Sequence, residues 1–244
     1  MSIFKKFIKK TEKAVVTEKE EIREKSDQIY SDVEMKEEIL NRLVALGGTF
    51  TKGRDKTLIS GLLDVTFDTV FYPKPEDTPW SKADETEPIY GVSEFIKENH
   101  GLYRENKSEF YDKMIKYYFC LTEGGQGQDF WEGTLFTPFK KKTADHGEWI
   151  DWFETEADLS IITQLTKDEK PDFIRLFHGC GFPDQYYICL SDPNLNDPTV
   201  FGTDHEEFFV EISNHGKLSD FLNRYMDQNE LINLVEMMME KFEG

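Results

Sequence analysis

Residues 173–212 read FIRLFHGCGFPDQYYICLSDPNLNDPTVFGTDHEEFFVEI, a stretch in which short apolar runs alternate with turn-forming residues. The runs are rich in aromatic and β-branched side chains, as strands are, and the residues between them are mainly Gly, Pro, Asn and Asp. Each run is short enough to be one strand. We predict strands over 173–177, 186–191, 200–203 and 208–212, followed by a turn at 213–216.

Helical periodicity surrounds this stretch on both sides. Residues 33–46 (VEMKEEILNRLVAL) place their apolar side chains along one helical stripe, and Gly47-Gly48 supplies a C-terminal stop. Further helices are predicted over 92–99, 106–118, 218–225 and 231–242, and a half-buried strand over 63–71. Grouped strands flanked by helices, without regular strand–helix alternation, predict an α+β fold: a mixed, mainly antiparallel sheet flanked by helices, with an N-terminal helical extension.

Composition divides the chain into three parts. Residues 1–30 form a basic to mixed-charge helical arm, in which residues 1–13 hold five lysines and a single glutamate. The segment YPKPEDTPWSKADETEP (72–88) carries four prolines and many charges, which is typical of an exposed loop. We therefore predict an N-terminal extension over 31–88, with a helix and a strand that end in this loop, and an α+β domain over 89–244.

Charge narrows the class of partner. Acidic side chains outnumber basic ones by 48 to 29, which leaves a formal net charge of −19. A field of that sign repels a phosphate backbone, whose binding rests on Lys and Arg, so we expect no nucleic acid partner. Two interpretations stay open: the charge keeps the protein in solution, or it steers a basic protein partner toward the surface.

Cysteine content and hydropathy predict a cytoplasmic protein. Three cysteines form neither an even disulfide framework nor a CxxC pair. The chain has no run of 18 apolar residues, and its N-terminus lacks the apolar stretch and cleavage site of a secretory signal. Mixed charges after Thr17 dilute any amphipathic face of the arm, so we expect no stable membrane anchoring.

Three runs in the second half, LFHGCGFPDQYYICLS, PTVFGTDHEEFF and EISNHGKLSDFLNRY, resemble in order and spacing the closing half of the SUKH superfamily. That superfamily includes fungal cell-wall-synthesis regulators and many bacterial immunity proteins. Its pattern is a glycine turn, a strand ending in an acidic residue, a second strand ending in Asp-His-Glu, and a helix with two apolar anchors. The matching elements here are Gly179 to Gly181, Tyr186 to Asp192, Asp204-His205-Glu206, and Leu218 to Leu222.

The resemblance covers residues 106–226 and departs from the family in three places, the first of which is Leu218, which stands where the family's last helix has its first Phe. The Leu-Pro-x-x-Tyr segment that the family has before its first helix is not recognisable. In the turn after a helix, where the family has Asn-Gly-Gly, Glu123 stands in place of the Asn. The resemblance implies a compact α+β fold, a protein-binding role and, in bacteria, neutralisation of a cognate toxin. A regulatory scaffold without a toxin, similar in role to the fungal relatives, is the alternative that it leaves open.

An aromatic and acidic segment, DHGEWIDWFETE (145–156), is the leading candidate for partner contact. Aromatic anchors among carboxylates suit recognition of a basic protein. The alternative is a core edge with a solvated acidic face. Asp192 and residues 204–207 are added to the candidates because the resemblance places acidic residues at the ends of these two strands. The predicted partner-binding residues are therefore Glu148, Trp149, Asp151, Trp152, Glu154, Asp192, Asp204, Glu206 and Glu207.

The segment Asp204-His205-Glu206-Glu207 also contains the residue types of a metal site or an acid–base pair. Adjacent residues on a strand point to opposite faces, so we expect a strand-end turn with capping contacts instead. The tight ligand spacing of zinc sites is absent from the set His178, Cys180, Cys189 and His205. We expect no metal, no cofactor and no catalytic residue, with a hydrolase that uses Asp204 and His205 as the alternative.

Overall fold

The computed structural model describes residues 33–51, 57–74, 89, 91–119, 128–179 and 184–243. Within these residues the chain forms eight helices and seven strands. The predicted arm at 1–30, Cys180 and most of the proline-rich loop lie outside them. No helix in the described part combines the length and the apolar character that crossing a membrane requires.

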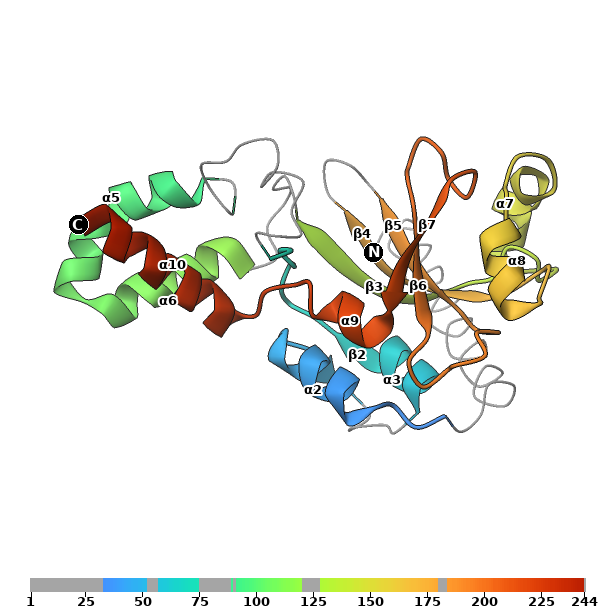
Figure 1. Cartoon of the computed structure of the whole chain (residues 1–244), viewed down its shortest axis with the longest axis horizontal. Helices are drawn as coiled ribbons and strands as arrows, with labels where there is room; N and C mark the ends of the chain where they lie inside the picture. Colours follow the sequence, from blue (N-terminus) through green and yellow to red (C-terminus); the bar gives the residue numbers. More distant parts are fainter. Residues whose placement is uncertain are drawn as a thin grey trace, which may run out of the picture.

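Five strands form one antiparallel sheet in which neighbours along the chain are neighbours in space. They are β3 (Asp129–Phe136), β4 (Phe173–Gly179), β5 (Gln185–Cys189), β6 (Thr199–Thr203) and β7 (Ile212–Lys217). Together with the helices around it (Figure 1), this sheet confirms the predicted α+β class.

Three helices cover one face of the sheet (Figure 1): α2 (Glu37–Ala45), α3 (Leu58–Asp64) and α9 (Leu218–Leu222). The strand residues Ile174, Ile188 and Val200 point to this face and share one buried cluster with Leu43 and Leu62 of the helices. The segment predicted as an N-terminal extension therefore supplies one wall of the main core.

The opposite face is covered by α7 (Ala144–Thr155) and α8 (Ser160–Thr166). Phe173, Tyr187 and Phe201 alternate along the strands with the residues of the first face, and they join a second buried cluster with Phe153 and Phe209. The central strands β4, β5 and β6 are therefore buried on both faces, which explains why they read as nearly continuous apolar runs.

A third buried cluster lies at the end of the molecule away from α7 and α8 (Figure 1). The stripe predicted for 106–118, including Phe110 and Met114, faces this cluster. The helices that build it are α5 (Val92–Glu105), α6 (Lys107–Phe119) and α10 (Gln228–Glu243).

The prediction of one strand over 63–71 is wrong. Helix α3 continues to Asp64, β2 (Val65–Thr66) pairs with β1 (Thr49–Phe50) in a two-stranded sheet, and Phe71 forms an isolated bridge with Asp129. Leu58, Ile59 and Leu62 bury one side of the helix. The first residues of the apparent alternation therefore belong to the end of a helix.

The predicted strand over 208–212 and the predicted turn at 213–216 are also wrong, because β7 occupies the place of the turn. Phe208 and Phe209 are both buried, whereas adjacent residues of a strand point to opposite faces. Phe209 N donates to Thr203 Oγ1 over 2.6 Å, and Phe209 has a φ of +55°. The chain consequently turns at the two phenylalanines before it enters β7.

Arg42 of α2 fixes this helix against the link between α9 and α10. Its guanidinium donates to the carbonyl oxygens of Leu222 and Tyr225 and to the carboxylates of Asp227, over 3.1 Å, and Glu230, over 2.7 Å. The two carboxylates also cap α10 reciprocally, since Glu230 N donates to Asp227 and Asp227 N donates to Glu230. Arg42 thus links α2, which covers the sheet, to α10 of the cluster formed by α5, α6 and α10, named the three-helix cluster below.

Replacing Arg42 by methionine is expected to lower the free energy of unfolding by about 2–3 kcal/mol, because it removes the one guanidinium that bonds two partly buried carboxylates and two carbonyl groups at once. Chemical denaturation at pH 7 measures the change. The control is Lys97→Met on the exposed side of α5, which is expected to stay within about 0.5 kcal/mol of the parent chain. Equal losses in the two variants would contradict the role given to Arg42.

Candidate functional site

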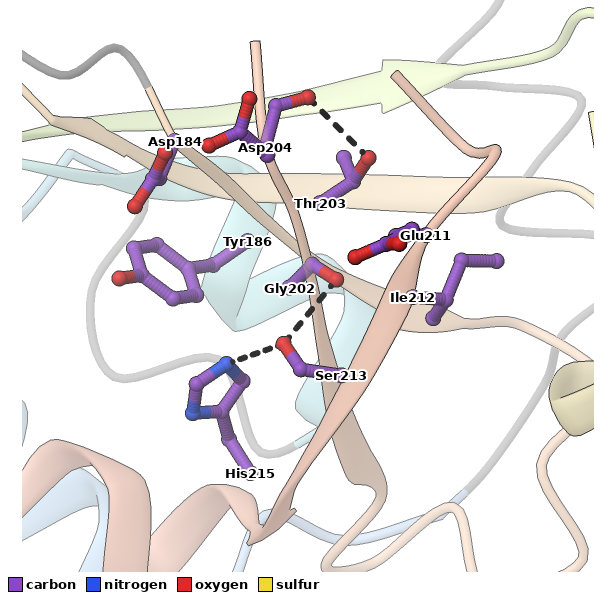
Figure 2. A pocket seen from close by; sticks show the side chains of 9 residues that line it. All are labelled: Asp184, Tyr186, Gly202, Thr203, Asp204, Glu211, Ile212, Ser213 and His215. Carbon is purple, nitrogen blue, oxygen red and sulfur yellow. Dashed lines mark hydrogen bonds between the residues drawn. The ribbon is translucent and has the colours of Figure 1, made fainter. Parts of the chain in front are cut away.

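The register of β5, β6 and β7 creates a polar pocket at one end of the sheet. Tyr186 pairs with Gly202, and Gly202 pairs with Ser213, so the three form one row across the strands. The pocket beside this row has a volume of about 270 Å³ (Figure 2). Its lining consists of Asp184, Tyr186, Gly202, Thr203, Asp204, Glu211, Ile212, Ser213 and His215.

Three carboxylates form a second row next to the first. Asp184 precedes β5, Asp204 follows β6 and Glu211 precedes β7, and each stands two residues before or after a member of the first row. All three line the pocket. Burial, and after it the nearby Asp204, raises the pKa of Asp184, whereas His205 lowers it. The three carboxylates therefore give the pocket a negative wall.

Gly202 leaves the space for the pocket. A Cβ atom on residue 202 would lie 2.5 Å from His215 Nε2 and 2.8 Å from Ser213 Oγ. Both distances are below the separation of any ordinary carbon contact, so a side chain here would displace the floor of the pocket. The hollow between Tyr186 and Ser213 consequently depends on this glycine.

His215 is neutral, with its proton on Nε2. Arg224 Nη1 lies 2.9 Å from His215 Nδ1, and a guanidinium only donates, so Nδ1 accepts. Nε2 then donates to Ser213 Oγ over 2.7 Å, and Ser213 Oγ donates to Gly202 O over 3.2 Å. Burial and then Arg224 lower the pKa of His215 to about 4. The imidazole therefore has no free nitrogen to take a proton from Ser213, as the base of a serine nucleophile must.

His205 lies beside the row of carboxylates. Its Nδ1 is 3.5 Å from Asp204 Oδ1 and 3.8 Å from Asp184 Oδ1. Among the described residues, these three form the cluster whose possible metal-ligand atoms all lie within 4.8 Å of one another. Asp204 Oδ1 also accepts from Glu206 N over 2.6 Å, which is the strand-end turn expected from the sequence. All three side chains are at least 31% exposed, so this group lies on an open surface.

A fourth carboxyl group belongs to the same electrostatic cluster. Tyr225 Oη donates to Asp129 Oδ2 over 2.6 Å. Burial raises the pKa of Asp129 to about 6, although the hydrogen bond from Tyr225 lowers it, and Asp184 raises it further. Burial, and then Asp129, also raises the pKa of Tyr186 in the pocket lining. A buried carboxyl group that ionises near neutral pH therefore adds to the negative potential.

Eight of the nine predicted partner-binding residues come from two segments that are in contact. The ring centroid of Trp149 in α7 lies 4.5 Å from that of Phe208, and Trp152 Nε1 donates to Phe208 O over 2.7 Å. Both tryptophans are half-buried and pack on the core, as in the core-edge interpretation. The exposed carboxylates of α7 and the β6–β7 loop, named the acidic surface below, are Glu148, Asp151, Glu154, Asp204, Glu206 and Glu207.

Asp192 does not belong to the acidic surface, and its predicted role is corrected. The residue is only 4% exposed. Its Oδ1 accepts from Asn194 N over 2.7 Å and its Oδ2 accepts from Thr199 N over 2.9 Å. The carboxylate stabilises the loop between β5 and β6 and is not available to a partner.

The histidine and cysteine set does not gather within the described residues. Cys189 is buried with its Sγ 3.2 Å from Ser191 Oγ, and burial raises the pKa of this thiol to about 11. His178 stacks on Phe130 and has Nδ1 2.9 Å from Glu132 Oε1. Cys180 lies outside the described residues.

Sequence reasoning missed Asp184, Glu211, Ser213 and His215 as members of the pocket. The signal for them was the strand register, which is readable only once β7 is placed at 212–217. With a turn predicted at 213–216, the serine and the histidine had no strand to bring them beside Gly202.

Comparison of the chain with protein-family models, curated proteins and solved structures gives no significant match in any of the three.

The variant Asp129→Asn is expected to gain stability at neutral pH. An acid whose pKa is raised on folding, here from 3.8 to about 6, holds its proton more tightly in the folded chain. The parent chain therefore loses stability as the pH rises through this interval, by on the order of 2–3 kcal/mol in total. The amide cannot ionise and escapes this loss.

Chemical denaturation of Asp129→Asn at pH 4 and pH 7.5 measures the effect. The gain over the parent chain is expected to be about 2 kcal/mol larger at pH 7.5 than at pH 4. The matched control is Asp112→Asn on the exposed side of α6, which is expected to show no such difference. A gain that does not change between the two pH values would contradict the assignment of a buried, near-neutral carboxyl group.

Proposed function

We propose that this chain is a cytoplasmic protein-binding module that holds a basic protein against its acidic surface and pocket, and that in a bacterial setting this partner is a toxin which the chain neutralises. The observation that carries the proposal is the concentration of carboxylates at one end of the sheet. Asp204 belongs both to the acidic surface and to the pocket, so the two are continuous.

Electrostatics supports a basic partner. The exposed carboxylates of α7 and the β6–β7 loop stand next to the carboxylates of the pocket, in a chain whose formal net charge is −19. Such a field raises the rate of encounter with a positively charged protein and makes the complex sensitive to salt. A field that served only solubility has no need to gather Asp184, Asp204 and Glu211 in the lining of one pocket.

The order of the elements supports the resemblance to the SUKH superfamily. Strands β5 and β6, the Asp-His-Glu turn after β6, and helix α9 follow one another in the order that the resemblance implies. In this frame the Asp-His-Glu turn forms the junction between the acidic surface and the pocket. A role in toxin neutralisation fits an acidic protein of this kind, because occluding a basic active surface needs affinity and no chemistry.

The hydrolase alternative has less support from the geometry. His205 and Asp204 are close, but they lie on an open surface, and the nearby Ser213 donates its proton to a carbonyl while it accepts from His215. In a catalytic serine–histidine pair the hydrogen bond runs the other way, with the serine donating its proton to the histidine.

Affinity capture from the native lysate tests the proposal. The bait is the full chain, beside a variant in which Glu148, Glu154, Glu206 and Glu207 become glutamine and Asp151 becomes asparagine. The parent chain is expected to enrich a protein of high isoelectric point, and the variant is expected to lose at least nine-tenths of that capture. Raising the salt concentration from 0.1 to 0.5 M is expected to have the same effect on the parent.

The matched control removes five exposed carboxylates elsewhere, by Glu94→Gln, Glu98→Gln, Glu105→Gln, Asp112→Asn and Glu240→Gln on the three-helix cluster. It changes the net charge equally and is expected to retain the partner. Capture that is equally weak in both variants would mean that only net charge matters. Failure of the parent chain to enrich any basic protein from the native lysate would contradict the proposed function.

A further inference from the structure

We propose that the outer edge of β7 pairs with an extended segment of the basic partner, and that an arginine or lysine of this segment enters the pocket between Glu211 and Asp204. This inference rests on the proposed function and names the chemistry of the contact.

The first observation is an open strand edge beside the pocket. β7 is the last strand of the sheet, and within the described residues no strand pairs with its outer side. Ser213 and Asn214 are exposed there and carry no charge. Exposed edges normally carry a lysine or a distortion that blocks pairing, and here Lys217 and the left-handed Gly216 stand only at the far end of the strand. The half of β7 next to the pocket is therefore open to a partner strand.

The second observation is that this half of β7 also lines the pocket. Glu211, Ile212, Ser213 and His215 are all part of the lining. Glu211 directly precedes β7 and lines the pocket together with Ser213, so a partner strand that extends past Ile212 brings a side chain next to Glu211. Figure 2 shows Glu211 at the start of β7, with Asp204 and Asp184 across the pocket from it.

The distance from the partner strand to Asp204 determines how long the entering side chain must be. Neighbouring strands lie about 4.8 Å apart, so Asp204, which directly follows β6, lies two strand spacings, about 10 Å, from a strand paired with β7. Only Arg and Lys combine a positive head with a stem long enough to approach Asp204 while passing Glu211. The stem would lie along Ser213, over the space that Gly202 leaves open.

The carboxylates that line the pocket favour a cation that also donates hydrogen bonds. Three carboxylates line the pocket, and His215 is neutral because Arg224 donates to its Nδ1. Asp184 Oδ1 has His205 Nδ1 at 3.8 Å, beyond hydrogen-bond distance, and accepts no hydrogen bond among the described residues, so a partner's donor can bond to this partly exposed carboxylate. A guanidinium supplies several donors to such a group and screens the repulsion within the row. A volume of about 270 Å³ accommodates one side-chain head but is below that of most small-molecule sites.

Titration of the full chain with the peptide acetyl-Thr-Val-Arg-Val-Thr-amide tests the proposal, with amide chemical shifts as the readout. Saturable binding is expected at millimolar or lower concentration, with the largest shifts at residues 184–186, 202–204 and 211–215. Replacing the arginine by citrulline, which keeps its shape and removes its charge, is expected to weaken binding about tenfold.

Two N-methylated peptides test strand pairing. One carries methyl groups on the valine amides, and the other carries them on the amides of arginine and the threonines. In a paired strand only one of these sets faces β7, so one peptide is expected to lose binding and the other to retain it. Retention or loss by both would overturn the pairing.

The double variant Asp184→Asn, Glu211→Gln is expected to weaken peptide binding about tenfold, and the matched variant Glu148→Gln, Glu154→Gln on α7 less than twofold. Equal losses in the two variants would overturn the role of the pocket in binding. Shifts that centre on α7, or a peptide that does not bind, would overturn it as well. Displacement of the peptide by 1 mM Mg²⁺ or Zn²⁺ would mark the pocket as a metal site and would also overturn the proposal. A basic protein that is captured by the acidic surface while the peptide fails at the pocket would overturn this inference alone and leave the proposed function standing.

Discussion

The backbone pairing of β5, β6 and β7 is the constraint on which the rest of the structure depends. It places Tyr186, Gly202 and Ser213 in one row and puts three carboxylates beside them, although those carboxylates repel. The pairing persists because both faces of the sheet are buried under helices over most of its length, and this apolar burial outweighs the repulsion at one end. Stability is thus concentrated where the sheet is covered, and the charges collect where it is not.

The α+β class and three of the five main strands were predictable from sequence, because β4, β5 and β6 are apolar runs bounded by turn residues. The start of α6 agrees with the helix predicted over 106–118, and Asn106 and Glu109 bond to each other there. α7 and α8 were not predicted. The aromatic residues of α7 were recognised as a group, yet their carboxylates and the start at Thr143 did not stand out as a helix pattern.

The pocket was unpredictable for a physical reason. Phe208, Val210 and Ile212 alternate as in a strand, but both Phe208 and its neighbour Phe209 are drawn into the core against Phe153 and Tyr187. Tertiary packing overrides the local pattern and moves the strand four residues along the chain. Only then do Ser213 and His215 face Gly202. The exposure of the carboxylates of α7 and of the turn after β6 was predictable from sequence, because charged side chains need no register to be placed on the surface, whereas the burial of Asp192 is invisible in composition.

The central claim is that the carboxylates at the open end of the sheet, and not the overall charge, meet the partner. Carboxyl-to-amine crosslinking of the captured complex, followed by peptide mass spectrometry, tests it most directly. The account predicts crosslinks from Asp184, Asp204 and Glu211 to lysines of one partner segment, with few from the three-helix cluster. Crosslinks spread evenly over Glu94, Asp112 and Glu240 as well, or absent from the pocket, would contradict it.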